Sequence, residues 1–156
     1  MAILMNVNQF QQSAIKGALD LHTAGSGVIT GVVSSNQSGA VYPGDRVALD
    51  NVAGSYVPSF VTVATGVAAI GAVVFSSKKS SSTYVAGDVI EVALITGPAA
   101  IMYCEVSSAA AIVAQAAVQW AAGQTVVAGT TKQMGIALDA GAVGSLIRVI
   151  LTVVTL

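Results

Sequence analysis

Residues that can act as a nucleophile or as a general base are few in this sequence. His22 is the only histidine, and Cys104 is the only cysteine. Nucleophilic catalysis of the Ser/His/Asp or Cys/His kind needs a base held beside the nucleophile, and these two residues are far apart in the sequence. We therefore expect no catalytic role for either one. A single cysteine also excludes an intrachain disulfide and a CxxC metal or redox motif.

Carboxylates are the remaining side chains that can act in pairs as a general acid and a general base. The candidates for such a pair are Asp45, Asp50, Asp88, Glu91, Glu105 and Asp139. Asp45 and Asp88 each follow a glycine in similar turns, where an aspartate accepts hydrogen bonds from its own turn, so we expect both to be structural. Cysteine and histidine are too few for a zinc site, and no DxDxDG-type calcium loop occurs. The sequence thus predicts no catalytic, cofactor-binding or metal site.

Three similar stretches of sequence predict the elements that would hold these side chains. They are Tyr42–Leu49, Tyr84–Leu94 and Trp120–Val127. Each begins with an aromatic residue, continues through small residues to Gly-Asp, or to Gly-Gln in the third, and ends in apolar residues that alternate. Glycine gives the backbone freedom that a tight turn needs, and a period of two is typical of a half-buried strand. We expect three strands after similar turns, and each aromatic residue either anchors the core or lines a ligand groove.

Other stretches extend the β-rich pattern. The turn at Asn51–Ser55 predicts one hairpin, and the turn at Thr96–Pro98 predicts a second hairpin that pairs Val89–Ile95 with Ala100–Val106. Gly66–Phe75 is apolar on both faces, which is typical of a strand covered on two sides. Such a strand lies either inside a sandwich or in a contact between subunits.

Two regions that depart from this β-rich pattern determine the expected domain organisation. Residues 1–35 are polar, nearly uncharged and weakly patterned, which predicts an extended N-terminal arm with one short strand near Val28–Val33. Residues 107–117 are rich in alanine and begin with serines that can cap a helix, so they predict either a short helix or a loop that leads into a strand. Residues 36–156 are expected to form one β-rich domain. The predicted fold is mainly β, a small antiparallel β-barrel or sandwich-like domain.

Composition restricts the classes of function. Hydrophobic residues make up 54% of the chain and charged residues only 8%, against about 25% charged in an average soluble domain. The formal net charge is −1, whereas nucleic-acid binding rests on clustered lysine and arginine. We therefore expect no nucleic-acid partner, and we expect much of the surface to be buried against other protein.

Two long uncharged runs raise the question of membrane insertion. Asn51–Ser77 is interrupted by Gly54, Pro58 and further glycines, and Val106–Thr131 consists mostly of alanine with serine, glutamine and glycine. Such residues insert poorly compared with leucine, isoleucine or phenylalanine. The first residues also lack the basic region and the long apolar region of a signal peptide. We therefore expect no membrane partner, and an integral membrane protein is the less favoured alternative.

Several of these features together resemble the capsid decoration, or cement, proteins of tailed bacteriophages. The likeness covers roughly Val41–Leu156 of this small chain, which is poor in charge and rich in alanine, glycine and valine. The residues that carry it are the turns at Gly44-Asp45 and Gly87-Asp88, the segments Gly66-Val67-Ala68 and Gly135-Ile136-Ala137-Leu138, and the closing strand Leu146-Ile147-Arg148-Val149.

The resemblance implies a structural virion protein that is not an enzyme. Proteins of this family bind the outside of a phage head, often as trimers, and clamp neighbouring copies of the major capsid protein together. The implied partners are thus the major capsid protein and further copies of this chain, and the implied location is the exterior of the capsid. Burial of apolar surface is enough for this role and needs no cofactor.

Another phage assembly subunit would share this composition. A tail-tube, baseplate or shell subunit also buries much of its surface against other protein. The position of the protein on the particle separates these alternatives from a decoration protein, because a decoration protein lies on the outside of the head.

Overall fold

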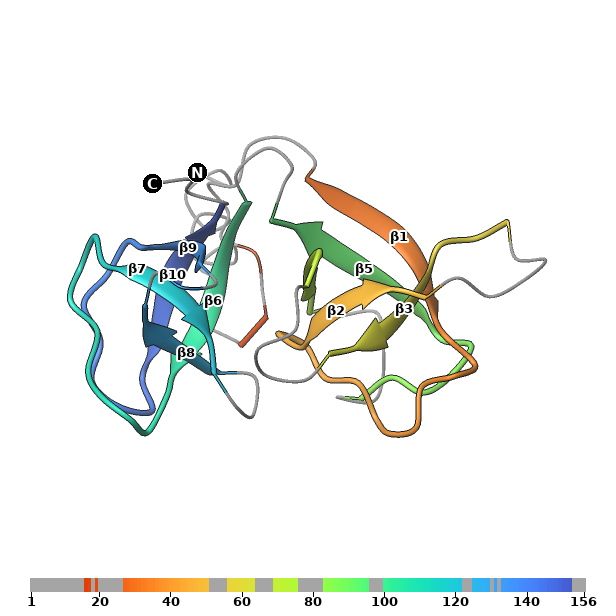
Figure 1. The fold of residues 1–156 in the computed structure, drawn as a ribbon, viewed down its shortest axis with the longest axis horizontal. Coiled ribbons are helices and arrows are strands. Elements are labelled where there is room, and N and C mark those ends of the chain that lie inside the picture. The colour runs from red at the N-terminus through yellow and green to blue at the C-terminus, as the bar shows by residue number, and fades with distance from the viewer. Residues whose placement is uncertain are drawn as a thin grey trace, which may run out of the picture.

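The computed structural model describes residues 16, 17, 19, 27–50, 56–63, 69–75, 83–95, 100–121, 125–129, 131 and 133–152. These residues form ten β-strands and no helix, so the predicted mainly β fold is confirmed. The strands form two closed barrels (Figure 1). The first barrel contains β1 (Val28–Val33), β2 (Arg46–Leu49), β3 (Ser59–Thr62), β4 (Gly71–Val73) and β5 (Val89–Leu94). The second barrel contains β6 (Ala100–Val106), β7 (Ala117–Trp120), β8 (Thr125–Ala128), β9 (Gln133–Ala137) and β10 (Leu146–Leu151).

The two barrels share one strand order. In the first barrel the order is β1-β3-β2-β4-β5, and β5 closes the ring on β1. In the second barrel the order is β6-β8-β7-β9-β10, and β10 closes the ring on β6. Each ring contains one parallel pair, β1 with β3 and β6 with β8, and its other pairs are antiparallel. The described chain is therefore one five-stranded unit built twice.

Backbone hydrogen bonds at the turns repeat in the same way. The N–H of Gly87 donates to the carbonyl of Val33, and the N–H of Gly144 donates to the carbonyl of Val106, each at 2.9 Å. In both barrels a bridge of two hydrogen bonds also ties the loop after the first strand to the turn before the last strand. The bridged residues are Val41 with Tyr84 (2.8 and 2.8 Å) and Ile112 with Gly141 (2.9 and 2.8 Å).

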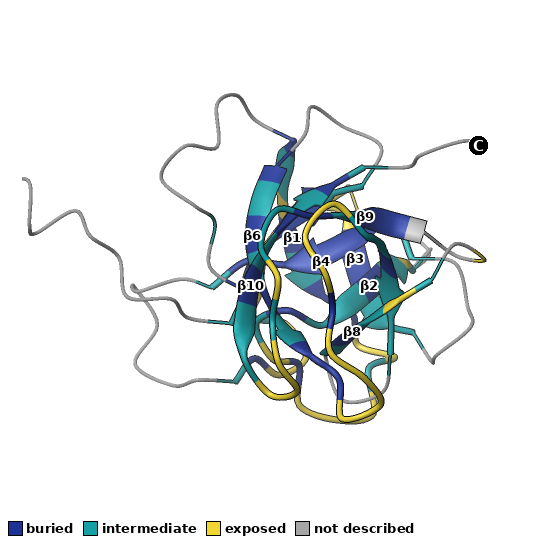
Figure 2. Cartoon of the chain, turned by 90° about the vertical axis from the view of Figure 1, so that its left-hand side faces the viewer, coloured by how far each residue is buried: buried dark blue, intermediate teal, exposed yellow. Residues whose placement is uncertain are grey.

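Each barrel is filled by alternate residues of its own strands (Figure 2). Along β6 and β10, buried and half-buried residues alternate without interruption, as side chains on opposite faces of a strand require. The core of the first barrel contains Val33, Val41, Val47, Phe60, Val73, Tyr84, Ile90 and Val92. The core of the second barrel contains Ala100, Met102, Cys104, Val106, Ile112, Val118, Val126, Met134, Ala137, Ile147, Val149 and Leu151.

The first barrel supplies three more buried residues, Ala72, Val74 and Ala93, that pack with the core of the second barrel. Ala72 of β4 and Ala93 of β5 are directly opposite each other, whereas Val73 belongs to the core of the first barrel. β4 is therefore covered on both faces, as predicted for Gly66–Phe75, of which residues 69–75 are described. The cover on its outer face is the second barrel.

A short N-terminal segment connects to both barrels. The N–H of Gly17 donates to the carbonyl of Tyr103 in β6 (2.8 Å), and the carbonyl of Gly17 accepts from the N–H of Phe75 after β4 (2.9 Å). Leu19 forms an isolated bridge with Met102. Gly17 is buried, and a Cβ atom built on it would lie 2.5 Å from the backbone nitrogen of Gly44. This segment therefore ties the barrels together at a point where only a glycine fits.

One predicted hairpin is confirmed and the other is wrong. β2 pairs with β3 in antiparallel fashion, as expected from the turn at Asn51–Ser55, whose own residues lie outside the described part of the chain. Val89–Ile95 and Ala100–Val106 do not form the second hairpin, because β5 pairs with β1 and β4 while β6 pairs with β8 and β10. β5 belongs to the first barrel and β6 to the second, and the expected turn at Thr96–Pro98 lies outside the described residues.

Two other expectations change in the structure. Residues 107–117 contain turns, the bridge at Ile112 and the first residue of β7, so the alternative of a short alanine-rich helix is wrong. The arm expected for residues 1–35 overlaps the first barrel, because β1 pairs with β3 and β5 as an integral strand. The boundary expected at residue 35 thus falls inside that barrel, and residues 36–156 include parts of both barrels.

Candidate functional site: the groove between the barrels

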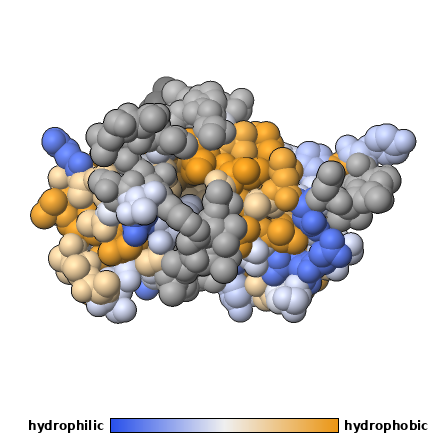
Figure 3. Space-filling model, viewed as in Figure 1, coloured by the Kyte–Doolittle hydropathy of each residue, from blue (hydrophilic) through white to orange (hydrophobic). Residues whose placement is uncertain are grey.

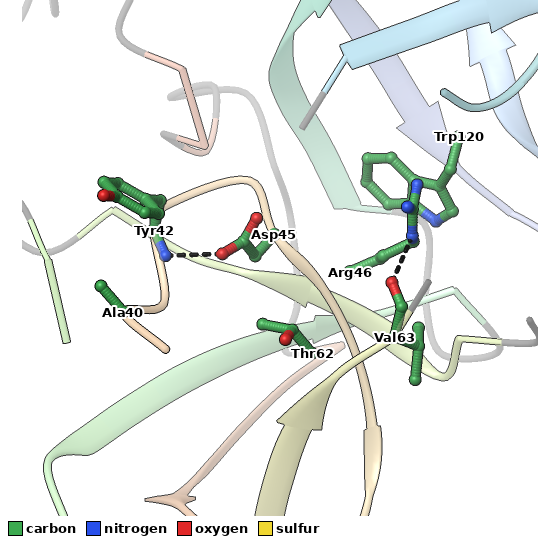
Figure 4. A pocket seen from close by; sticks show the side chains of 7 residues that line it. All are labelled: Ala40, Tyr42, Asp45, Arg46, Thr62, Val63 and Trp120. Carbon is green, nitrogen blue, oxygen red and sulfur yellow. Dashed lines mark hydrogen bonds between the residues drawn. The ribbon is translucent and has the colours of Figure 1, made fainter. Parts of the chain in front are cut away.

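A pocket of about 250 Å³ opens between the two barrels (Figure 4). Its walls come mainly from the first barrel, and one residue of β7 closes it from the second barrel. The lining residues are Ala40, Tyr42, Asp45, Arg46, Thr62, Val63 and Trp120. Two of the three aromatic residues that lead the predicted turns, Tyr42 and Trp120, therefore line a pocket, and the third, Tyr84, anchors the core of the first barrel.

Arg46 joins the two barrels across this pocket. Its Nε donates to the carbonyl of Val63 (2.7 Å), and its Nη1 donates to the carbonyl of Ala121 in the second barrel (2.8 Å). Burial lowers the pKa of Arg46 from its ordinary value, and the nearby charge of Asp45 acts in the opposite direction. Because these donors are directed at backbone carbonyls, the guanidinium acts as a structural link. The sequence around Arg46 contains no sign of this link, because Ala121 is distant along the chain.

Trp120 lies beside Arg46 at this pocket (Figure 4). Its indole Nε1 is buried and has no hydrogen-bond partner, and the same is true of Oε1 of the preceding residue, Gln119. An unpaired buried donor or acceptor costs about 1–3 kcal/mol. Two buried polar atoms of β7 therefore lack hydrogen-bond partners. Trp120 is held in place by the packing of its indole against the core of the second barrel.

The carboxylates in the glycine turns bond to backbone of their own turns. Oδ2 of Asp45 accepts from the N–H of Tyr42 (2.7 Å), and Oδ2 of Asp88 accepts from the N–H of Val85 (2.8 Å). This is the local hydrogen bonding expected of an aspartate in such a turn. These contacts give both aspartates a structural role in their turns.

The other four carboxylates have separate surroundings. Asp50 accepts hydrogen bonds from Ser34 Oγ and from Asn36 Nδ2 (2.9 Å). Glu105 forms an ion pair with Lys16 Nζ (2.6 Å), which adds a contact between the N-terminal segment and β6. Asp139 accepts two hydrogen bonds from the guanidinium of Arg148 (2.8 and 2.9 Å) and one from the backbone N–H of Arg148 (3.1 Å). Glu91 is exposed on β5, as expected of a charged residue in a strand that faces solvent.

Cys104 does not provide a reactive thiol. It is buried in the second barrel, and burial raises its pKa to about 12. The thiol is the poor nucleophile of the two protonation states, so Cys104 is inert near neutral pH. His22 lies outside the described residues. No group of three or more His, Cys, Asp or Glu side chains that could hold a metal ion occurs among the residues described.

Large apolar side chains that remain exposed lie mostly in loops and turns. Those of the first barrel are Tyr42, Leu49, Tyr56, Val57, Val85 and Val89, and those of the second barrel are Val113 and Val143. Within the described ranges, no helix is long and apolar enough to cross a membrane.

Comparison with known proteins gives a likeness among solved structures. No protein-family model matches this sequence, and no curated protein matches it. Among solved structures, the fold is similar to the crystal structure of the N base of head fiber gp8.5 in bacteriophage phi29. The TM-score is 0.57, the two chains are 14% identical, and the match covers 83% of this chain and 98% of the other. At this low identity the likeness describes the fold.

Proposed function

We propose that this protein is a structural component of a tailed-bacteriophage head. In this role it binds the outer surface of the capsid and stabilises the lattice of the major capsid protein. The observation that carries the proposal is the likeness to the N base of a phage head fiber, which extends over 98% of that chain. The match covers 83% of this chain, which is more than one barrel alone provides, so it extends into both barrels.

The composition supports the same role. A chain with 54% hydrophobic and 8% charged residues is suited to bury apolar surface against other protein, at about 25 cal/mol for each Å² removed from water. Among the described residues, Asp45 and Asp88 support turns and Cys104 lies in a core. Glu105 and Asp139 form ion pairs. We infer that the protein is not an enzyme and that its partners are the major capsid protein and further copies of itself, in a homotrimer.

Cryo-electron microscopy of the phage particle tests this proposal. We expect density with the shape of two adjoining barrels on the outer surface of the head, at repeated positions of the lattice. Density for this chain in the tail tube or baseplate would overturn the proposal and would support the assembly alternative. Recovery of the chain in a membrane fraction, with none on particles, would also overturn it.

A binding measurement adds an energetic test. Heads prepared without this protein are mixed with the purified full chain, sedimented and then exposed to heat or low ionic strength. We expect the chain to sediment with the heads and to raise the temperature at which they release their contents. Heads that bind the chain with no gain in resistance would contradict the stabilising role.

A further inference from the structure

The first half of β1 has a neighbouring strand on one side only (Figure 1). β1 pairs with β5 from Val28 to Val32, but it pairs with β3 only at Val32 and Val33. Among the described residues, no strand therefore lies beside Val28–Gly31 on the side away from β5. Thr30 is exposed there. We call this side of Val28–Gly31 the open edge of β1.

Hydrogen bonds along β1 show which of its backbone groups point to the open edge. The carbonyl of Gly27 accepts from the N–H of Leu94 (2.6 Å), and the N–H of Val33 donates to the carbonyl of Asp88 (2.9 Å). The odd-numbered residues of β1 therefore bond to β5, and in an antiparallel pair the residues between them point the other way. The N–H and C=O groups of the even-numbered residues, Thr30 among them, are directed at the open edge.

The strand β3 cannot satisfy the carbonyl of Thr30. The N–H of Val32, which points the same way, donates to the carbonyl of Pro58 (2.9 Å). The next donor in a parallel ladder would be the nitrogen of Pro58 itself, but proline has no N–H group. Within the described ranges, nothing donates a hydrogen bond to Thr30 from this side. Unpaired groups at a strand edge are a template for a further strand.

The second barrel has the same edge, and there a segment of the chain covers it. β6 pairs with β8 only over its last two residues, so Tyr103 is the counterpart of Thr30. The carbonyl of Tyr103 accepts from the N–H of Gly17 (2.8 Å), and Leu19 forms an antiparallel bridge with Met102. The repeat therefore shows what fits this edge, namely a segment from the N-terminal part of this chain.

Residues 3–8 have the sequence pattern of such a segment. The stretch is Ile3-Leu4-Met5-Asn6-Val7-Asn8. Met5 and Val7 alternate with Asn6 and Asn8, which is typical of a half-buried strand. The stretch has no charge and no proline, so each of its residues can donate its N–H. Figure 3 shows hydrophobic atoms, in orange, in the region of β1 and β5, and an uncharged, partly apolar strand is suited to lie beside them.

The same chain can supply this strand. Seven residues separate Asn8 from Lys16, and an extended segment of that length spans about 25 Å. Leu19 and Val28 both pack against the core of the second barrel, so the N-terminal segment passes close to the start of β1. A strand tethered so near to its site is present at a high effective concentration.

We propose that Ile3–Asn8 binds the open edge of β1 as an added strand of the same chain. The N-terminal part then holds both barrels, with Gly17 and Leu19 on β6 and Ile3–Asn8 on β1. The added strand also keeps the open edge from pairing with strands of other molecules. It does not depend on the proposed function, because the edge and its covered counterpart belong to the fold itself.

Amide hydrogen exchange of the full chain, followed by NMR, tests the added strand. The variant Asn6→Pro/Val7→Pro removes two successive N–H groups, one on each side of the strand, and Asn6→Ala/Val7→Ala is the matched control that keeps them. We expect exchange at Thr30 to be slow in the unchanged chain and in the alanine variant, and about tenfold faster in the proline variant. Exchange at Gly31, whose N–H faces β5, should be equal in all three. Fast exchange at Thr30 in the unchanged chain, or equal protection of Thr30 in all three, would overturn the proposal.

A spin label identifies the molecule that supplies the strand. Met5→Cys is labelled at its new thiol, whereas the native Cys104 is buried and stays unreactive. The label should broaden the NMR signal of Thr30 in its own chain and should leave that signal unchanged in isotope-labelled chains mixed with it. Broadening in the mixture would assign the edge to a second copy. Slow exchange at Thr30 only after phage heads are added would assign the edge to the capsid. Either result would overturn the proposal, and the second would leave the proposed function standing.

Discussion

Inside the first barrel, the ring of Phe60 packs against Gly31. In the second barrel, Val126 occupies the position of Phe60, and Cys104 occupies the position of Gly31. A Cβ atom on Gly31 would lie 2.4 Å from Cε2 of Phe60, so a large residue on β3 requires a small one on β1. In the second barrel the smaller Val126 of β8 leaves room for Cys104 on β6, and both are buried. The same barrel backbone therefore accepts different core side chains, as long as their total volume inside the barrel is conserved.

The turns of the two barrels differ in a related way. In the first barrel Asp45 and Asp88 support their turns with carboxylate hydrogen bonds. In the second barrel Ala116 has no side-chain acceptor, and Ser145 donates its hydroxyl to the carbonyl of Ala142 (2.7 Å). The backbone bonds are nevertheless the same in both. Backbone pairing therefore carries the shared fold, and the aspartates are local additions that the second barrel does without.

The largest expected effect concerns the tie between the barrels. Gly17 has φ +79°, and its Cβ position is 2.5 Å from the nitrogen of Gly44. Gly17→Val should lower the free energy of unfolding by about 3–4 kcal/mol, from a left-handed backbone and a steric clash together. Gly87→Val is the control, since Gly87 has φ +87° and nothing lies within 4 Å of its Cβ position.

Denaturant unfolding followed by circular dichroism measures this difference. If the tie couples the barrels, Gly17→Val should also split one unfolding transition into two, because each barrel has its own core. Gly87→Val should keep the single transition of the unchanged protein. Equal losses for the two variants would mean that the backbone conformation, and not the contact between barrels, sets the cost at Gly17.

The next effect tests the exchange of volume between the two cores. Gly31→Ala should destabilise the protein by about 2–3 kcal/mol, because the added methyl group meets the Phe60 ring and the carbonyl of Pro58, each 2.4 Å away. Adding Phe60→Val, which imitates Val126 of the second barrel, should make the cost of Gly31→Ala smaller. Thermal unfolding of both single variants and the double variant forms a cycle, and strictly additive losses would refute the exchange.

A smaller effect, of opposite sign, is expected at Gln115. It is the non-glycine residue with positive φ (+67°) among those described, and it occupies the place of Gly44 (φ +87°) in the first barrel. Gln115→Gly should raise the free energy of unfolding by up to about 1 kcal/mol, because glycine adopts this conformation without a Cβ penalty. Gly44→Ala should lower it. A melting temperature that falls for Gln115→Gly would show that the glutamine side chain contributes more than the strain costs.

The smallest effect is a pH dependence in the second barrel. Hydrogen bonds from the Arg148 side chain lower the pKa of Asp139 below its ordinary value, so the folded state binds this proton less tightly than the unfolded state does. The resulting stability is complete above about pH 4 and is lost as the pH falls through the folded pKa. Because both side chains are more than one third exposed, Asp139→Asn should cost less than about 1 kcal/mol at pH 7.

Unfolding of the unchanged protein and of Asp139→Asn at several pH values measures this contribution. The difference between their free energies of unfolding should shrink steadily on acidification. A difference that grows as the pH falls would have the wrong sign and would exclude the ion pair as its source.

The elements that depend on local chemistry could be predicted from the sequence. β2 and β5 begin directly after Asp45 and Asp88, because a Gly-Asp turn and an alternating strand are both encoded within a few residues. The third expected turn shows the limit of this reasoning. Trp120–Val127 spans the link between the antiparallel strands β7 and β8, whereas the true counterparts of the Gly-Asp turns are at Gln115 and Gly144. Without aspartates, those turns carry no local signature.

Pairing between distant segments could not be predicted. The alternation of Val89–Ile95 and Ala100–Val106 is compatible with a hairpin, and only the closure of each ring on its own first strand excludes it. The same holds for the groove between the barrels, where Arg46 bonds to Ala121 and Gly17 bonds to Tyr103. These contacts follow from how two finished barrels pack, and one-dimensional patterns do not contain that information.

Ring closure has a consequence for how copies of this chain can meet. Each of the ten described strands has a hydrogen-bonded neighbour on both sides, so those strands offer no full-length free edge to an incoming strand. Most β-proteins guard their edges against aggregation with charged residues such as lysine, which this chain largely lacks. Here geometry replaces charge as the safeguard. A crowded array of such molecules is then protected from fusing sheet to sheet, and its copies can be joined and separated through side chains alone.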